Sequence, residues 1–326
     1  MWSVASFGHC YGDATFVAYT SSVLEQQWLD NVAKWQHEVC AHTSNATIKQ
    51  LLDAVQGDVS SVVTRNATML HDTLSYFTYA LRDAQFLHVP IEPTMSLARD
   101  PRKCWNIWSE DYVQSKAYLL PLSGSFCRTS HHQRPILIDA GAGPWAGKMP
   151  FPTLLGNPLE PEPSDFGTSW IWDWYRRHDI DFDQIFAWEP KKPEWDVSGD
   201  EAHPLALFFR ALHFSNTKVT NEDGGVDNPL TTIRKMCRGV GRVCVFKLDI
   251  DSPVLEEKLL EAFLSNRSLT EVVDEFYVEK HIRNGAMKMH GMGTDRRFPH
   301  GVNDLSHWYT TVTNARKKGL RMHFWP

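Results

Sequence analysis

The stretch ILIDAGAG at residues 136–143 joins an apolar run to an acid and two glycines. The apolar run predicts a buried parallel strand, and the glycines predict a turn where backbone comes close to a ligand. In open α/β sheets, ligands collect beyond the carboxyl ends of the strands. We therefore expect a nucleotide-like cofactor at this turn. For this segment alone, an ordinary strand followed by a glycine turn is the simpler interpretation.

Two further strands are predicted to end in acids. Residues 184–188 form an apolar run followed by Glu189, where a carboxylate is placed to accept hydrogen bonds from a ribose diol. Residues 242–251 form a near-continuous apolar run, as expected of a strand buried on both faces. A surface glutamate before a proline turn is the simpler interpretation of Glu189, but the acid in the first strand favours the ribose role. The acids expected at one edge of the sheet are Asp139, Glu189, Asp249 and Asp251.

The elements that position these acids alternate between strand and helix from residue 135 onward, which predicts a doubly wound α/β sheet. A proline-rich insertion at 144–165 lengthens the separation between the first two acids. Beyond the first strand, strands are expected at 184–188, 214–219, 242–251, 272–281 and 320–326. Helices are expected at 168–178, 204–212, 229–236, 254–264 and 304–316.

Residues 1–115 are expected to form a helical appendage to an α/β domain at 116–326. Apolar residues at helical spacing predict an amphipathic helix at 21–40, and a heptad-like pattern predicts a longer one at 52–76. We favour a helical hairpin packed on the main domain, with a stalk or dimerising coiled coil as the alternative. Its helices would also provide a docking surface for a protein partner.

Composition excludes some classes of partner. The net charge of -6 is spread along the chain without a basic run, which argues against nucleic acid. The hydrophobic content of 42% is ample for a core. No window approaches the roughly 18 apolar residues of a membrane span, and the first residues lack a basic segment followed by an apolar one. We expect a soluble chain.

The cysteines and the Asn-x-Ser/Thr glycosylation triplets bear on the cellular compartment of the protein. The six cysteines include no CxxC pair, which argues against a zinc site and leaves disulfides open. Asn-x-Ser/Thr triplets also arise by chance in a chain of this length. Together with the even number of cysteines, they favour a secretory or Golgi lumen slightly. The three triplets begin at Asn45, Asn66 and Asn266.

Segments in the C-terminal two thirds of the chain resemble one family. They are DAGAG at 139–143, AWEP at 187–190, NPL at 228–230, FKLDID at 246–251 and DEFYVEKH at 274–281. In this order they look like the FkbM-type family of S-adenosylmethionine-dependent methyltransferases, and the plant and algal members of unassigned activity are the most similar. The resemblance covers residues 134–326. Residues 1–133 resemble no family that we can name.

The resemblance implies a class I methyltransferase fold, which is Rossmann-like, with S-adenosylmethionine as cofactor. Glu189 would bind the cofactor ribose, and Asp249 and Asp251 would lie beside the methionine end and the substrate mouth. The chain departs from the family pattern at the glycine turn, where Trp145 stands in place of a glycine, and after the fourth strand. The residues implied to contact the cofactor are Asp139, Gly141, Gly143, Glu189 and Asp249.

The expected reaction is in-line transfer of a methyl group from a sulfonium to a hydroxyl oxygen of a small molecule or glycan. Alignment of the two reactants supplies much of the barrier reduction. A base would assist a hydroxyl acceptor, and the candidates are Asp251, Glu279 and His281. A metal-free site is preferred to a metal site that these three residues would build with Asp249.

Two other functions stay open. One is a non-catalytic, methyltransferase-like scaffold or assembly subunit, because the glycine segment is altered and aromatic residues such as the thirteen tryptophans are enriched where partners bind. The other is a glycan-modifying transferase that uses a nucleotide sugar. The nucleotide-sugar hypothesis is the weaker of the two, since the methyltransferase resemblance already explains the DID sequence at 249–251.

Overall fold

The computed structural model describes residues 14–42, 74–82, 85–94, 119–122, 134–142, 168–190, 205–238, 242–279 and 305–325. The chain divides into two compact units. The first unit consists mainly of Asp13–Pro121 and Val278–Pro326, and the second mainly of Leu122–Tyr277. This division differs from the one expected at residue 115, because the C-terminal residues group with the N-terminal ones.

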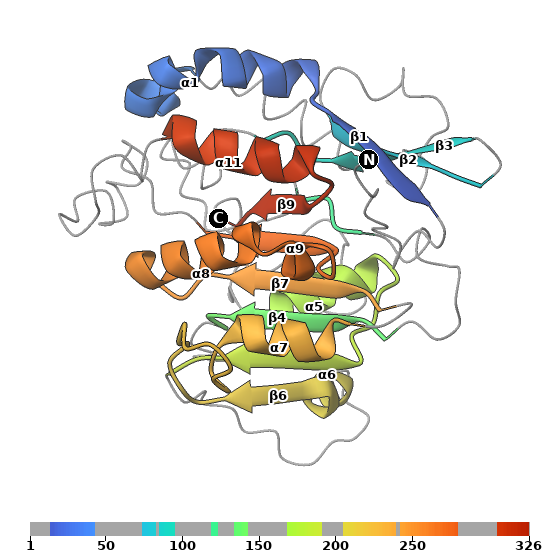
Figure 1. The fold of residues 1–326 in the computed structure, drawn as a ribbon, viewed down its shortest axis with the longest axis vertical. Coiled ribbons are helices and arrows are strands. Elements are labelled where there is room, and N and C mark those ends of the chain that lie inside the picture. Colours follow the sequence, from blue (N-terminus) through green and yellow to red (C-terminus); the bar gives the residue numbers. More distant parts are fainter. Residues whose placement is uncertain are drawn as a thin grey trace. The chain divides into compact units, whose positions relative to one another are not determined.

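A parallel sheet forms the core of the second unit (Figure 1). Its strands are β4 (Ile136–Ala140), β5 (Gln184–Trp188), β6 (Leu212–Ser215), β7 (Cys244–Leu248) and β8 (Glu275–Val278). The strand order is β6-β5-β4-β7-β8, and β9 (Arg321–Phe324) is sixth in that order. β4 pairs in parallel with both β5 and β7, and β5 pairs in parallel with β6.

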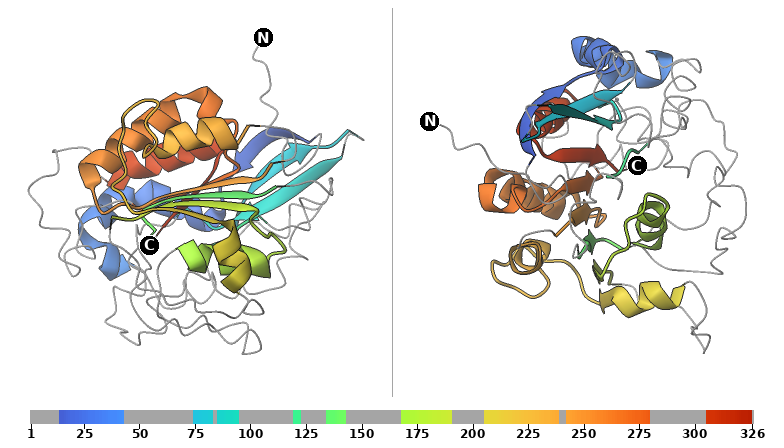
Figure 2. Two further views of the ribbon diagram at one scale, coloured as in Figure 1. Left: turned by 90° about the horizontal axis from the view of Figure 1, so that it is seen from below. Right: turned by 90° about the vertical axis from the view of Figure 1, so that its right-hand side faces the viewer.

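Helices cover both faces of this sheet (Figure 2). β4 and β7 are buried along their whole length, as expected of strands covered on both sides. One face carries α5 (Thr168–Arg177) and α6 (Leu205–Ala211). The other carries α7 (Pro229–Met236), α8 (Pro253–Ser265) and α9 (Arg267–Thr270). The prediction of an α/β sheet with helices on both sides is therefore confirmed.

Local sequence explains where these helices begin. Pro229 is the first residue of α7, a position whose N–H would have no helical partner in any case. The side chain of Asn228 caps the helix by accepting a hydrogen bond of 2.9 Å from the Leu230 N–H. α8 also begins with a proline, Pro253. The helix predicted at 229–236 is thus confirmed at both ends.

The first unit contains strands as well as helices. Its antiparallel sheet consists of β1 (Thr15–Thr20), β2 (Ser75–Ala80) and β3 (Phe86–Ile91). α1 (Val23–His42) packs against α11 (Leu305–Lys317) in the same unit. The expectation of a helical appendage is therefore corrected: α1 confirms the helix at 21–40, but Tyr76 lies in β2. Residues 52–73 of the expected longer helix lie outside the described residues.

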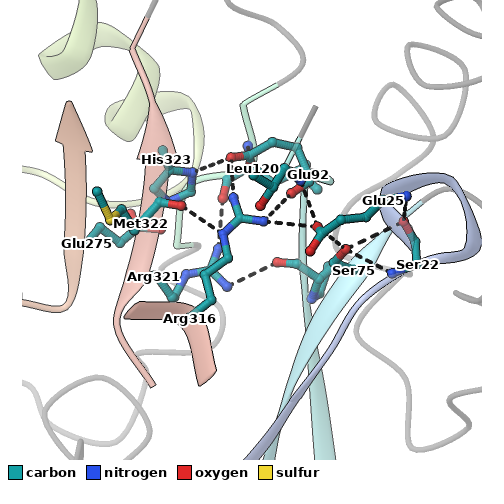
Figure 3. A network of polar contacts seen from close by, with 12 residues as sticks. Ser22, Glu25, Ser75, Glu92, Leu120, Glu275, Arg316, Arg321, Met322 and His323 are labelled. Atoms are coloured by element: carbon teal, nitrogen blue, oxygen red, sulfur yellow. Dashed lines mark hydrogen bonds and ion pairs between the residues drawn. The ribbon is translucent and has the colours of Figure 1, made fainter. Parts of the chain in front are cut away.

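A buried charged network holds the first unit together (Figure 3). The Arg316 guanidinium lies between Glu25 and Glu92, at 3.4 and 3.3 Å, and none of the three side chains is more than 5% exposed. His323 Nδ1 lies 2.8 Å from Glu92 Oε1, and Ser75 Oγ donates to Glu25 Oε2 at 2.7 Å. These residues come from α1, β2, the end of β3, α11 and β9. The N-terminal and C-terminal parts of the first unit therefore share one core.

A disulfide joins Cys237, which follows α7, to Cys244, the first residue of β7. Both half-cystines are completely buried. The sequence leaves disulfides open, and nothing in the spacing of the six cysteines singles out this pair. It connects the end of a covering helix to a central strand of the second unit.

Candidate cofactor site at the edge of the parallel sheet

The Asp139 carboxylate, near the end of β4, is fully buried and both of its oxygens are engaged. Oδ1 lies 3.1 Å from Lys247 Nζ, and Oδ2 accepts a hydrogen bond of 2.6 Å from Thr168 Oγ1. Asp139 and Lys247 are Cα partners in the parallel pairing of β4 with β7. Thr168, the first residue of α5, ties the start of that helix to β4. Asp139 thus shapes the turn after β4, and its contact with a cofactor stays a prediction.

Lys247 is 1% exposed, and its ammonium group contacts two carboxylates and a backbone carbonyl. Besides the Asp139 contact, Nζ donates to Gly141 O at 2.6 Å and lies 3.2 Å from Asp249 Oδ2. Burial alone would lower the pKa of Lys247, but the two carboxylates hold that pKa above its usual value. Burial raises the pKa of Asp139, and the Lys247 charge opposes the rise. Lys247 is absent from the site predicted from the sequence, and its signal there is a lysine within an otherwise apolar strand.

Gly141 lets the turn after β4 lie directly against the end of β7. Its φ is 95°, and a Cβ at this position would be 1.4 Å from Asp249 O. Any side chain would therefore collide with backbone as well as strain the left-handed conformation. The N–H groups of Gly141 and Ala142 both donate to Trp188 O at 3.1 Å. Hydrogen bonds with β5 and β7 therefore hold the turn from both sides.

Parallel register brings the expected acids to one edge of the sheet. Ala140 pairs with Trp188 in β5 and with Leu248 in β7, so Glu189 and Asp249 both come directly after these strand ends. Glu189 is 8% exposed, and the Asp249 side chain is 21% exposed. The common edge expected from the sequence is therefore present. The acids placed there are Asp139, Glu189 and Asp249.

Asn216, which sequence analysis missed, holds the backbone beside Glu189. Its Nδ2 donates hydrogen bonds of 3.1 Å to Glu189 O and to Pro190 O. Asn216 directly follows β6, the neighbour of β5 in the sheet. The only signal in the sequence is an amide side chain at the end of the next strand. Its position makes the loop after β5 dependent on β6.

Glu256, in the first turn of α8, holds the loop after β7. Its Oε1 accepts hydrogen bonds from Ile250 N at 2.9 Å and from Ser252 N at 3.4 Å. Burial, assisted by the charge of Asp249, raises the pKa of Glu256 to about 8. Asp251 in the same loop is exposed, with a φ of 52° that non-glycine residues seldom adopt. A buried acid thus supports a loop that presents Asp251 to solvent. Glu256 is absent from the site predicted from the sequence.

The remaining predicted site residues are Glu279, Gly143 and His281. Glu279, a candidate base, follows β8, belongs to the first unit and is 3% exposed. Gly143 and His281 lie outside the described residues. Their roles in binding and catalysis therefore stay predictions.

The chain matches no protein-family model, and no curated protein or solved structure is significantly similar to it. Within the described ranges, no helix is long and apolar enough to cross a bilayer. The α/β fold and the acidic sheet edge therefore rest on the geometry alone.

Proposed function

We propose that the protein is an S-adenosylmethionine-dependent methyltransferase that acts on a hydroxyl group of a small molecule or glycan. The observation that carries the proposal is the kind of side chain at the carboxyl edge of the sheet. Glu189, Asp249 and Asp251 follow β5 and β7 at the edge where ligands of such sheets bind. S-adenosylmethionine carries positive charge on its sulfonium and ammonium groups. Acids at this edge are complementary to both.

The described part of this edge is poorly suited to phosphate. Proteins bind phosphate through backbone N–H groups of a turn or helix start and through cationic side chains. Here the N–H groups of Gly141 and Ala142 donate to Trp188 O. Lys247 is buried against Asp139 and Asp249. The arrangement supports a cationic cofactor over a nucleotide sugar.

Each described acid has a role in the proposed reaction. Glu189, whose backbone is held by Asn216, accepts hydrogen bonds from the ribose hydroxyls. Asp249 lies beside the positive charge of the cofactor. Asp251 accepts the proton of the substrate hydroxyl, a contribution of about 10²–10⁴-fold. When bound, the cofactor supplies a methyl group already activated on sulfur, and alignment of the substrate contributes up to about 7–11 kcal/mol.

Isothermal titration of the full chain with S-adenosylmethionine and with its demethylated product tests this proposal. We expect both to bind, and Glu189→Gln to weaken binding about tenfold, because a hydrogen bond to a charged group contributes about 1.5–3 kcal/mol. Glu261→Gln, on an exposed position of α8, is the matched control and should bind like the wild type. Absence of binding to the wild type, or binding of a uridine diphosphate sugar instead, overturns the proposal.

A non-catalytic scaffold is the second candidate, and the engagement of Asp139 favours it. Lys247 and Thr168 already satisfy this carboxylate, so the turn after β4 keeps its shape without a ligand. A scaffold would fold normally and give no heat with S-adenosylmethionine. The same titration therefore separates the two functions.

A further inference from the structure

Asn266 connects two helices at the surface of the second unit and begins a glycosylation triplet. It ends α8, caps the start of α9 and is followed by Arg267 and Ser268. Asn266 is partly exposed, and its neighbours Ser265, Arg267 and Ser268 are exposed. A glycan attached here would extend into solvent and displace no core residue.

The cap and a glycan would use different atoms of Asn266. Its Oδ1 accepts hydrogen bonds from Ser268 N at 3.1 Å and from Ser268 Oγ at 2.8 Å. Nδ2, the atom to which an N-linked glycan is attached, donates to no group among the described residues. Arg267, which lies between Asn266 and Ser268 in the chain, forms an ion pair of 2.5 Å with Glu271. The folded turn therefore keeps its cap when Nδ2 is modified.

The disulfide is an independent observation on the compartment. Cys237 and Cys244 are bonded and fully buried in the same unit as Asn266. Disulfides form and persist in oxidising compartments such as the lumen of the endoplasmic reticulum. N-linked glycans are carried by proteins of that pathway. The buried disulfide and the exposed triplet thus indicate the same environment.

We propose that Asn266 carries an N-linked glycan, added in the secretory lumen in which the Cys237–Cys244 disulfide also forms. In the transfer, Nδ2 bonds to the anomeric carbon of an oligosaccharide linked to a lipid diphosphate. The bond from that carbon to the diphosphate oxygen breaks, and the diphosphate leaves with the electron pair. The amide proton passes to a base of the transferase. This proposal is independent of the methyltransferase proposal.

Peptide mapping of the full chain purified from its native source tests the site. Trypsin releases residues 259–267, which contain Asn266 and no other triplet of this kind. We expect this peptide to carry a glycan mass, and a peptide N-glycosidase to remove it and convert the asparagine to aspartate. Mapping without reductant should recover Cys237 linked to Cys244.

Two variants expressed in the same host separate the glycan from the cap. Ser268→Ala removes the hydroxyl that the triplet requires but keeps the backbone N–H that Asn266 caps, so the glycan should be lost while the protein stays folded. Ser268→Thr preserves the triplet and should keep the glycan. An unmodified Asn266 in the wild-type protein overturns the proposal. If Asn266 carried a glycan while Cys237 and Cys244 were free thiols, the inference that both modifications arise in one compartment would be wrong.

Discussion

Arg316 and Glu25 lie 291 positions apart in the chain, yet they form an ion pair of 3.4 Å between two fully buried side chains. Arg316→Met should lower the free energy of unfolding by about 3–5 kcal/mol, because it removes the guanidinium that the buried Glu25 and Glu92 carboxylates share. Urea unfolding followed by circular dichroism measures the loss.

An exposed ion pair provides the control for this substitution. Arg234 pairs with Asp223, whose side chain is 86% exposed. Arg234→Met should cost only about 0–1 kcal/mol, since solvent screens the pair. Equal losses of unfolding free energy in Arg316→Met and Arg234→Met would show that burial does not determine how much Arg316 contributes to stability.

Lys247→Met should also destabilise the protein by about 3–5 kcal/mol. The variant leaves Asp139 in the core with Thr168 as its side-chain partner among the described residues. Adding Asp139→Asn to the same chain removes the unpaired charge and should restore part of the loss. Urea unfolding of both single variants and the double variant gives the coupling energy. If the two substitutions changed the free energy of unfolding additively, Lys247 and Asp139 would not be energetically coupled.

The free energy of unfolding should fall as the pH rises from 4.5 to about 8. Over this range Glu256 is ionised in the unfolded chain but protonated in the folded one. Burial raises the folded pKa of Glu256 from 4.5 to about 8. Between these values the folded state holds a proton that the unfolded state has lost, so alkalinity favours unfolding. Glu256→Gln removes this pH-dependent loss. As the pH rises across this range, the free energy of unfolding of the variant should therefore increase relative to that of the wild type.

The measurement for Glu256 is a series of urea unfolding curves from pH 4.5 to pH 8. Glu261→Gln, on an exposed position of the same helix, should preserve the pH dependence of the wild type. A parallel pH dependence for wild type and Glu256→Gln would refute the shifted ionisation.

Asn216→Ala should weaken S-adenosylmethionine binding by about fivefold if Glu189 binds the ribose. The variant removes the two hydrogen bonds to Glu189 O and Pro190 O, and a net loss of about 1 kcal/mol corresponds to that factor. Thr217→Val, at the adjacent exposed position, is the control. Calorimetric titration gives the dissociation constants, and thermal unfolding shows whether the fold is retained. Unchanged affinity would place Asn216 outside the site.

Elements with strong local signals could be predicted from the sequence. The apolar run 184–188 is β5, and Pro229 marks the first residue of α7. The common edge of Glu189 and Asp249 follows from the parallel arrangement, because strands of equal direction end on the same side. The first two predictions succeeded because each depends on residues close together in the chain, and the third because all parallel strands end at one edge.

The antiparallel sheet of the first unit could not be predicted in this way. Tyr76 fits a helical spacing, but in SYFTYA the aromatic residues also suit a strand, and pairing with Val89 and its neighbours in β3 decides between the two. The partners of Arg316 and Lys247 are likewise set by tertiary contacts and strand register. Local pattern contains no information on a bond between positions 25 and 316.

The absence of a side chain at Gly141 has a mechanical consequence. Because its α-carbon fits against the Asp249 carbonyl with no room for a Cβ, the backbone at Gly141 cannot move closer to the end of β7 unless that end moves as well. The same loop after β7 presents Asp251 to the solvent. Adding a single methyl group here would wedge the two central strands apart at their tips.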